Sequence, residues 1–129
     1  MALAAVVGNQ IRILVADDHE MILDIARMYL DQQGDMSVVT VMDLDAALVA
    51  FRDDGPFDIV LLDYQMPGMD GLEGLQKMVA LAGGRPVAII TGNPTRKLMN
   101  QALDSGSAGI IAKSLPIRSL ANSIRFIHS

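Results

Sequence analysis

The chain has 129 residues, which is typical of one domain, and 51% of them are hydrophobic, enough to build a core. Its net charge is −5 and it contains no run of Lys or Arg, so direct binding to nucleic acid or to an anionic membrane surface is disfavoured. The absence of cysteine excludes disulfides and thiolate metal sites and is consistent with a cytoplasmic protein.

The first predicted strand, Ile11–Ala16, is a short apolar run that ends in two carboxylates, Asp17 and Asp18. Residues 1–10 are expected to be a lead-in segment. Within it, Met1–Val7 is apolar but lacks the basic region of a signal peptide and is too short for one. No apolar stretch approaches the roughly 20 residues of a membrane span.

A helix is predicted from about Glu20 to Gln32, with Gly34 as its stop signal. His19, directly before this helix, is interpreted as a loop or capping residue rather than as a catalyst. The apolar face of the helix is expected to consist of Ile22, Ile25, Ala26, Tyr29 and Leu30.

The second strand is predicted at Met36–Met42, which is rich in Val and Thr. Asp43 follows as the N-cap of a second helix that extends to about Arg52. Ile59–Leu62 is an apolar run without alternation, as expected for a parallel strand buried on both faces, and it ends in Asp63. The prolines and glycines that come next indicate that Asp63 stands where the strand gives way to a loop.

Asp70 is predicted to cap a third helix, from about Gly71 to Leu81. The fourth strand is Val87–Thr91, and Pro94 is expected near the first turn of a weakly patterned fourth helix that ends at 104–106. The nine Met of the chain are interpreted as filler of an aliphatic core.

Ala108–Ala112 is the fifth predicted strand, and Lys113 follows it. Pro116 opens a last helix that extends to about His128. Phe126 lies nearly opposite the apolar face of this helix and is expected to be exposed, either at a frayed terminus or at an interface with a dimer partner or an output domain. That apolar face consists of Ile117, Leu120, Ala121 and Ile124.

Five strands that alternate with five helices predict an α/β fold with a parallel sheet and helices on both faces. Parallel strands end at the same edge of a sheet, so one edge is expected to gather Asp17, Asp18, Asp63, Thr91 and Lys113. Clustered carboxylates repel one another unless a cation joins them. An oxygen-only set suits a hard ion such as Mg²⁺, with Mn²⁺ as an alternative, and it suits zinc and copper poorly.

Four motifs, at residues 16–18, 62–71, 90–92 and 112–113, occur in this order at these strand ends. Together they are specific, and over residues 11–127 the chain resembles a response-regulator receiver domain of two-component signalling. The resemblance implies a flavodoxin-like, doubly wound sheet with strand order 2-1-3-4-5. It also implies that the chain, 1–129, is a single receiver domain.

The function implied by the resemblance is a phosphorylation-dependent switch that regulates an output. Asp63 would accept a phosphoryl group from a phosphohistidine of a sensor histidine kinase or phosphotransfer protein, and Thr91 and Lys113 would contact phosphoryl oxygens. No enzymatic activity is implied beyond self-catalysed phosphorylation and dephosphorylation. A second copy of the chain is a further implied partner, in a homodimer that forms on phosphorylation.

The resemblance also implies a Mg²⁺ site at the same edge. Asp18 would bind the ion directly and Asp17 largely through water. Asp63 and the backbone carbonyl of Gln65 would complete the protein ligands. Phosphoryl transfer needs such a cation together with in-line positioning of the reactants.

Two positions depart from most receivers. Ile110 stands where an aromatic side chain usually swings inward on phosphorylation, and Lys113 is followed by Ser114 instead of proline. Together with Asp17-Asp18-His19, the segment Lys113–Pro116 resembles the NarL/LuxR-type subclass. Members of that subclass usually carry a C-terminal DNA-binding domain and the chain ends before one, so transcription would be regulated only through an absent output domain.

Two other classes of function are open. A pseudo-receiver is an interaction module that never carries phosphate; the acidic set with Thr91 and Lys113 argues against it, while Ile110 leaves it open. A haloacid-dehalogenase-type phosphatase also forms an aspartyl phosphate on a doubly wound sheet. That family has a second Asp two residues after its nucleophile, and neither Asp17 nor Asp63 is followed by one.

Overall fold

The structure is a computed structural model, and it describes residues 10–129, so residues 1–9 of the expected lead-in segment lie outside the described residues. In chain order its elements are β1 (Ile11–Ala16), α2 (Glu20–Asp31), β2 (Met36–Val41), α3 (Leu44–Asp53), β3 (Ile59–Asp63), α4 (Glu73–Ala82), β4 (Val87–Thr91), α5 (Arg96–Asp104), β5 (Gly109–Ala112) and α6 (Ile117–His128). The strands are all parallel and adjacent in the order β2-β1-β3-β4-β5, which confirms the expected topology.

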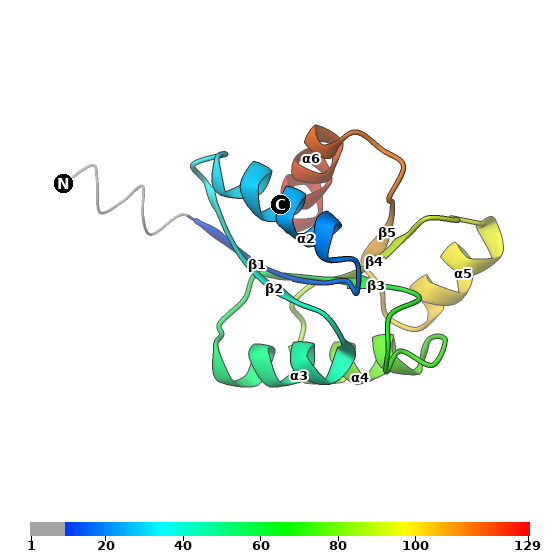
Figure 1. The fold of residues 1–129 in the computed structure, drawn as a ribbon. Helices are drawn as coiled ribbons and strands as arrows, with labels where there is room; N and C mark the ends of the chain where they lie inside the picture. Colours follow the sequence, from blue (N-terminus) through cyan, green and yellow to red (C-terminus); the bar gives the residue numbers. More distant parts are fainter. Residues whose placement is uncertain (1–9) are drawn as a thin grey trace.

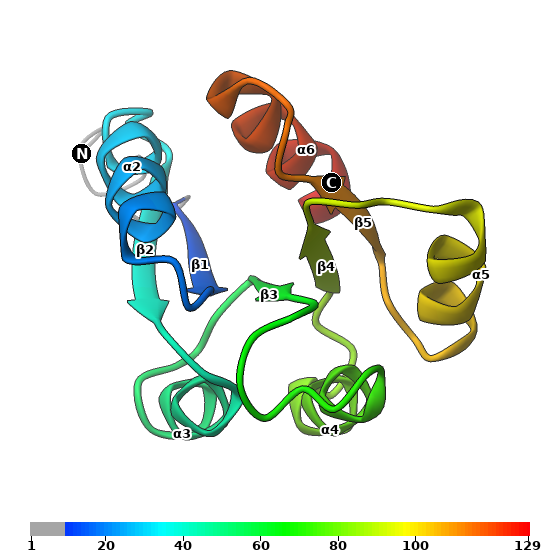
Figure 2. The same ribbon diagram turned by 45° about the vertical axis from the view of Figure 1, so that its right-hand side comes forward.

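Helices cover both faces of this sheet (Figure 1). The helices α2 and α6 lie on one face of the sheet and α3 and α4 on the other, while α5 lies at the β5 edge and packs into the same core as α3 and α4 (Figure 2). None of the helices in residues 10–129 is long and apolar enough to cross a membrane.

The strands divide their side chains between two cores. In β1, Leu14 and Ala16 face α3 and α4, whereas Ile13 and Val15 face α2 and α6. The central strand β3 is buried at every residue, as its unbroken apolar run predicted. Full burial of one aliphatic side chain of this size contributes roughly 1.5–3 kcal/mol, so the middle of the sheet anchors the strand ends firmly.

The buried face of α2 differs in part from the predicted one. Leu23 is buried together with Ala26 and Leu30, while Ile25 is 50% exposed. The pattern of apolar residues in α2 is wider than the stripe that one sheet face can cover, so the direction from which the helix approaches decides which of them is buried.

The methionines are not all buried in the core, in contrast to the prediction. Among residues 10–129, four are buried and four are exposed; Met36, Met66, Met69 and Met78 are buried and Met21, Met28, Met42 and Met99 are exposed. Core filling therefore describes only half of them.

Three helix starts show how local chemistry sets the boundaries. Asp43 caps α3 as predicted, and its carboxylate accepts a 2.7 Å hydrogen bond from the N–H of Ala46. Asp70 does not cap α4: it has a positive φ of 51° within the preceding loop, and Leu72 occupies the N-cap position. Thr95 caps α5, so Pro94 precedes that helix instead of lying in its first turn.

The last helix agrees with the prediction at its termini and at Phe126, which is 82% exposed. Ala121 and Ile124 are buried against the sheet. Arg125, predicted on the solvent side, is only half exposed because its guanidinium binds Asp35 through two contacts of 3.0 and 3.1 Å. This pair connects α6 to the turn before β2.

Candidate functional site

The carboxyl ends of β1, β3, β4 and β5 carry the polar residues that the sequence singled out. Asp17 follows β1 and Asp63 ends β3, and both are buried, with 0% and 2% of their surface exposed. Asp63 pairs with Ile90, the residue before Thr91, and the N–H of Lys113 donates to the carbonyl of Thr91 at 2.8 Å. The parallel register therefore brings these ends to one edge, as predicted.

The loop after Asp63 is held against α3. The N–H of Leu44 donates to the carbonyl of Pro67 at 3.1 Å, and Met66 and Met69 are buried. Gly68 has a φ of 92°, and a Cβ at this position would lie 3.0 Å from the Cβ of Leu44. A glycine is needed here because both the backbone conformation and the close packing disfavour a side chain.

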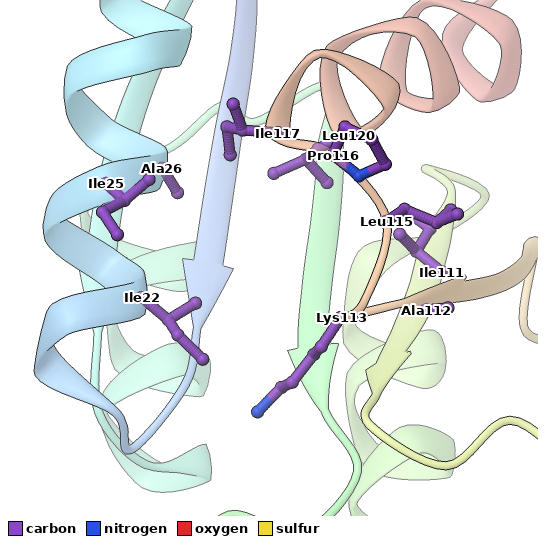
Figure 3. Close-up of a pocket in the computed structure, with 10 residues that line it drawn as sticks. All are labelled: Ile22, Ile25, Ala26, Ile111, Ala112, Lys113, Leu115, Pro116, Ile117 and Leu120. Atoms are coloured by element: carbon purple, nitrogen blue, oxygen red, sulfur yellow. The ribbon is translucent and has the colours of Figure 1, made fainter.

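Lys113 reaches into the acidic edge from β5. Its Nζ lies 3.0 Å from Asp17 Oδ2 and 3.1 Å from Asp63 Oδ2. Figure 3 shows its side chain leaving an apolar groove between α2 and the start of α6 and extending toward the ends of β1 and β3. One ammonium thus lies beside two buried carboxylates.

These contacts are charge contacts, because neither Asp17 Oδ2 nor Asp63 Oδ2 has a hydrogen-bond partner of acceptable geometry in the part of the chain that the structure describes. Buried carboxylate oxygens are costly unless they are paired or coordinate a cation. With three ionised carboxylates and one ammonium, the cluster of Asp17, Asp18, Asp63 and Lys113 has a net charge of −2. A divalent cation would balance that charge, and the donor set fits such an ion.

Burial and charge shift the pKa values of this cluster in different directions. Burial raises the pKa of Asp63 and the charge of Asp17 raises it further, so the nearby Lys113 and the Gln65 N–H offset the shift only in part. Burial also raises the pKa of Asp17, but the His19 N–H and Lys113 outweigh it and leave the pKa below its usual range. Burial lowers the pKa of Lys113, yet the two carboxylates raise it above its ordinary value. Asp63 is thus the carboxylate whose charge the site holds least easily.

His19 belongs to this cluster, which the sequence analysis did not predict. Its Nδ1 lies 2.9 Å from Asp17 Oδ1, 3.3 Å from Asp18 Oδ1 and 3.9 Å from Asp63 Oδ2. It occupies the N-cap position of α2, but its side chain makes no capping hydrogen bond. Its place directly after a carboxylate pair at a strand end was the signal that could have identified it.

Gln65 and Thr91 lie beside the acidic cluster rather than within it. The Gln65 N–H donates to Asp63 Oδ1 at 3.3 Å, and Thr91 Oγ1 accepts from the Asn93 N–H at 3.2 Å. Both residues line an open groove of about 290 Å³. Because a hydroxyl that accepts a hydrogen bond keeps its own proton to donate, Thr91 is suited to bind an anion there.

Comparison with known proteins gives consistent matches. The family model of the response regulator receiver domain matches residues 13–125. A glycerol metabolism activator of Pseudomonas putida is 34% identical over 117 residues, which are 90% of this chain and 53% of that protein. Response regulator GacA of Pseudomonas protegens is 30% identical over 118 residues, 91% of this chain and 55% of that protein. The chain therefore spans about half the length of these curated relatives.

A solved structure gives the same result. The signal receiver domain of the putative response regulator NarL from Mycobacterium tuberculosis is 28% identical, with a TM-score of 0.84, and the match covers 93% of this chain and 97% of that one. This likeness agrees with the subclass that the segment Lys113–Pro116 indicated. The family match also removes the haloacid-dehalogenase alternative. The chain belongs to the response regulator receiver domain family and is a receiver domain of two-component signalling.

Proposed function

We propose that Asp63 is the phosphoacceptor of this receiver domain. A carboxylate oxygen of Asp63 attacks the phosphorus of a phosphohistidine; the new O–P bond forms as the P–N bond breaks, and the donor imidazole takes back the electron pair. One observation carries the proposal: Asp63 Oδ2 is buried, lies 3.1 Å from the Lys113 ammonium, and has no hydrogen-bond partner in residues 10–129. An oxygen with free lone pairs beside a positive charge is suited to attack anionic phosphorus.

Two neighbouring residues are proposed to bind the phosphoryl oxygens. The Lys113 ammonium is close enough to Asp63 to follow the charge that moves onto those oxygens. Thr91, at the end of the adjacent strand, would donate its hydroxyl proton to another of them. Both contacts would also hold the phosphoryl group after transfer.

Mg²⁺, or alternatively Mn²⁺, is the proposed cofactor, held by Asp18, by Asp17 largely through water, by Asp63 and by the backbone carbonyl of Gln65. When bound, the ion supplies positive charge that balances the acidic cluster and the incoming phosphoryl group. The residues themselves create this requirement, because a cluster of net charge −2 repels an anionic donor.

Incubation with acetyl phosphate and Mg²⁺, followed by measurement of the intact mass, tests the assignment. The wild type should gain one phosphoryl group, and Asp63→Asn should gain none, because an amide is a poor nucleophile. Asp54→Asn changes an exposed carboxylate outside the cluster and should leave labelling unchanged. Labelling of Asp63→Asn would refute the assignment, and an unlabelled wild type would favour the pseudo-receiver.

The proposed partner is a phosphohistidine-bearing kinase or phosphotransfer protein in the cytoplasm. Its imidazole has to reach Asp63, so its docking surface has to border the site. The apolar groove of about 190 Å³ between α2 and α6 ends at Lys113 and includes the half-exposed Ile25 (Figure 3). Ile25→Asp should therefore lower transfer from the cognate kinase without changing labelling by acetyl phosphate, whereas equal loss of both would contradict this docking surface.

The phosphoryl group is proposed to switch the domain through Thr91 and the segment that leads into α5. Ile110 is half-buried against the core on the α3 and α4 side and has no polar tip that favours an exposed rotamer. Contacts of the phosphoryl group with Thr91 can bias two arrangements of residues 92–95, which is all that a population shift requires. Structures with and without beryllofluoride test this: a flip of Ile110 from solvent to core with residues 92–95 unmoved would contradict it.

The proposed output is transcription, regulated through a DNA-binding domain outside this chain. The match covers 55% of the length of two relatives that are named as response regulators, so those proteins extend beyond the matched region. The charge of −5 argues against direct contact of this domain with DNA, so the second domain would make that contact.

A further inference from the structure

We infer that His19 is a direct ligand of the metal ion in the acidic pocket, so that the pocket favours Mn²⁺ and later transition ions over Mg²⁺. The inference rests on the proposed function only in treating the pocket of Asp17, Asp18 and Asp63 as a cation site. It adds a nitrogen ligand to a set that sequence analysis described as oxygen-only.

The distances around His19 match those between ligands of one ion. Ligands about 2.1 Å from an octahedral ion lie about 3 Å apart when adjacent and about 4.2 Å apart when opposite. His19 Nδ1 lies 3.3 Å from Asp18 Oδ1 and 3.9 Å from Asp63 Oδ2, the two carboxylates proposed to bind the ion directly, and both distances fall within that range. One ligand atom from each of Asp17, Asp18, His19 and Asp63 lies within 4.8 Å of the others. Small side-chain shifts would therefore let Asp18, His19 and Asp63 bind one ion directly while Asp17 acts largely through water.

Two contacts with Asp17 Oδ1, one from the backbone and one from the ring, hold His19 in place. The His19 N–H donates to Asp17 Oδ1 at 2.9 Å, and Nδ1 lies at the same distance from that oxygen. Because the ring makes no capping bond to α2, binding an ion would not weaken the start of that helix. Nδ1 also lies 3.3 Å from Lys113 Nζ, so a bound ion would replace that ammonium as the positive charge nearest to the ring nitrogen.

His19 is an exposed member of the acidic cluster, whereas Asp17 and Asp63 are buried members. The His19 side chain is 61% exposed, whereas the Asp17 and Asp63 side chains are 0% and 3% exposed. The two carboxylate oxygens without hydrogen-bond partners within residues 10–129, Asp17 Oδ2 and Asp63 Oδ2, come from these buried side chains. An ion that enters from solvent would therefore meet imidazole and carboxylate groups together.

The nature of the ligand decides the selectivity. Mg²⁺ prefers oxygen and retains its waters, whereas an imidazole nitrogen strengthens binding in the order from Mn²⁺ through Co²⁺ and Ni²⁺. Mn²⁺ accepts both carboxylates and imidazole. Removal of His19 should therefore weaken Mn²⁺ and Co²⁺ binding by about tenfold or more and Mg²⁺ binding much less.

The test is pulsed electron paramagnetic resonance of the Mn²⁺-loaded chain at slightly alkaline pH, which detects ¹⁴N coupled to the ion without any measurement of phosphorylation. His19→Phe keeps a ring and removes both nitrogens, and His19→Ala is a second variant in case the larger side chain disturbs the fold. His128→Ala is the matched control, because His128 is the other histidine of the two in the chain. Circular dichroism reports whether each variant is folded.

The expected result is an imidazole ¹⁴N coupling in the wild type and in His128→Ala that is lost in both His19 variants. The inference is wrong if the wild type binds Mn²⁺, Asp18→Ala loses that binding, and the spectrum shows no coupling that depends on His19. That result would leave the proposed function intact. A chain that binds Mn²⁺ nowhere near the carboxylates overturns both. Competition between Mn²⁺ and Mg²⁺ supplies a second readout, and an unchanged preference in His19→Phe would overturn the claimed selectivity.

Discussion

Asp63→Asn should stabilise the metal-free domain at neutral pH although it removes the proposed phosphoacceptor. The reason is that the folded state holds the Asp63 charge with difficulty. Burial and the charge of Asp17 raise the pKa of Asp63 despite the ammonium of Lys113. An amide of the same shape has no charge to bury and leaves Lys113 paired with Asp17 at 3.0 Å.

The size of the effect follows from the geometry. At an effective dielectric constant of about 20, Lys113 at 3.1 Å attracts Asp63 by about 5 kcal/mol. A carboxylate oxygen of Asp17 lies within 4.8 Å of one of Asp63, so the charge of Asp17 repels that of Asp63 by about 3.5 kcal/mol or more. The net attraction of at most about 2 kcal/mol is smaller than the several kcal/mol needed to desolvate a buried carboxylate. We expect Asp63→Asn to add about 1–2 kcal/mol, which raises Tm by roughly 3–8 °C.

Urea unfolding in the presence of a chelator measures this difference, with the exposed Asp24→Asn as a control that should stay within about 0.5 kcal/mol of the wild type. Because the pKa of Asp63 is raised on folding, the native state loses stability as pH rises from the unfolded pKa to the folded pKa, and the penalty is fully present above the folded pKa. The advantage of Asp63→Asn should therefore vanish as pH falls below the unfolded value of about 3.9. A bound divalent ion should reduce the advantage, since tenfold excess over Kd stabilises the wild type by about 1.4 kcal/mol. If metal-free Asp63→Asn is less stable than the wild type at pH 7, the attraction of Lys113 outweighs burial and the reasoning is wrong.

Four further single substitutions test individual side chains. Asp18→Ala should weaken Mg²⁺ binding in a titration, because it removes the proposed direct ligand, and an unchanged isotherm would contradict that role. Arg125→Ala should lower the free energy of unfolding by less than about 1 kcal/mol, since the ion pair of Arg125 with Asp35 is half exposed. Arg125 lowers the pKa of Asp35, so this loss should be present above the usual pKa of an aspartate. The loss should disappear at lower pH or in high salt. Phe126→Ala should leave folding and phosphorylation intact and weaken self-association in sedimentation, and a wild type that is monomeric with and without beryllofluoride would exclude the dimer contact. Leu62→Ala should cost about 2–5 kcal/mol in urea unfolding, because the side chain is fully buried, and a loss below about 1 kcal/mol would show that the core relaxes around the cavity.

Much of the fold was determined by patterns that are local in the sequence. The unbroken apolar run Ile59–Leu62 predicts a strand buried on both faces, and the structure buries every residue of that strand. Asp43 was identified as a helix cap because capping is a contact between residues three positions apart. The meeting of Asp17, Asp63 and Lys113 was predictable as well, because strands joined through helices run parallel and end at one edge.

Other features were decided only by the tertiary structure. Whether Leu23 or Ile25 is buried depends on the direction from which α2 meets the sheet, and the sequence of the helix leaves that direction open. Arg125 pairs with Asp35, 90 positions away, because the end of α6 lies beside the turn before β2. The His19 ring lies beside Asp17, which follows β1, and Asp63, which ends β3, so its surroundings depend on how those two strands pack together. Such contacts depend on distances between elements, which local propensity and periodicity do not encode.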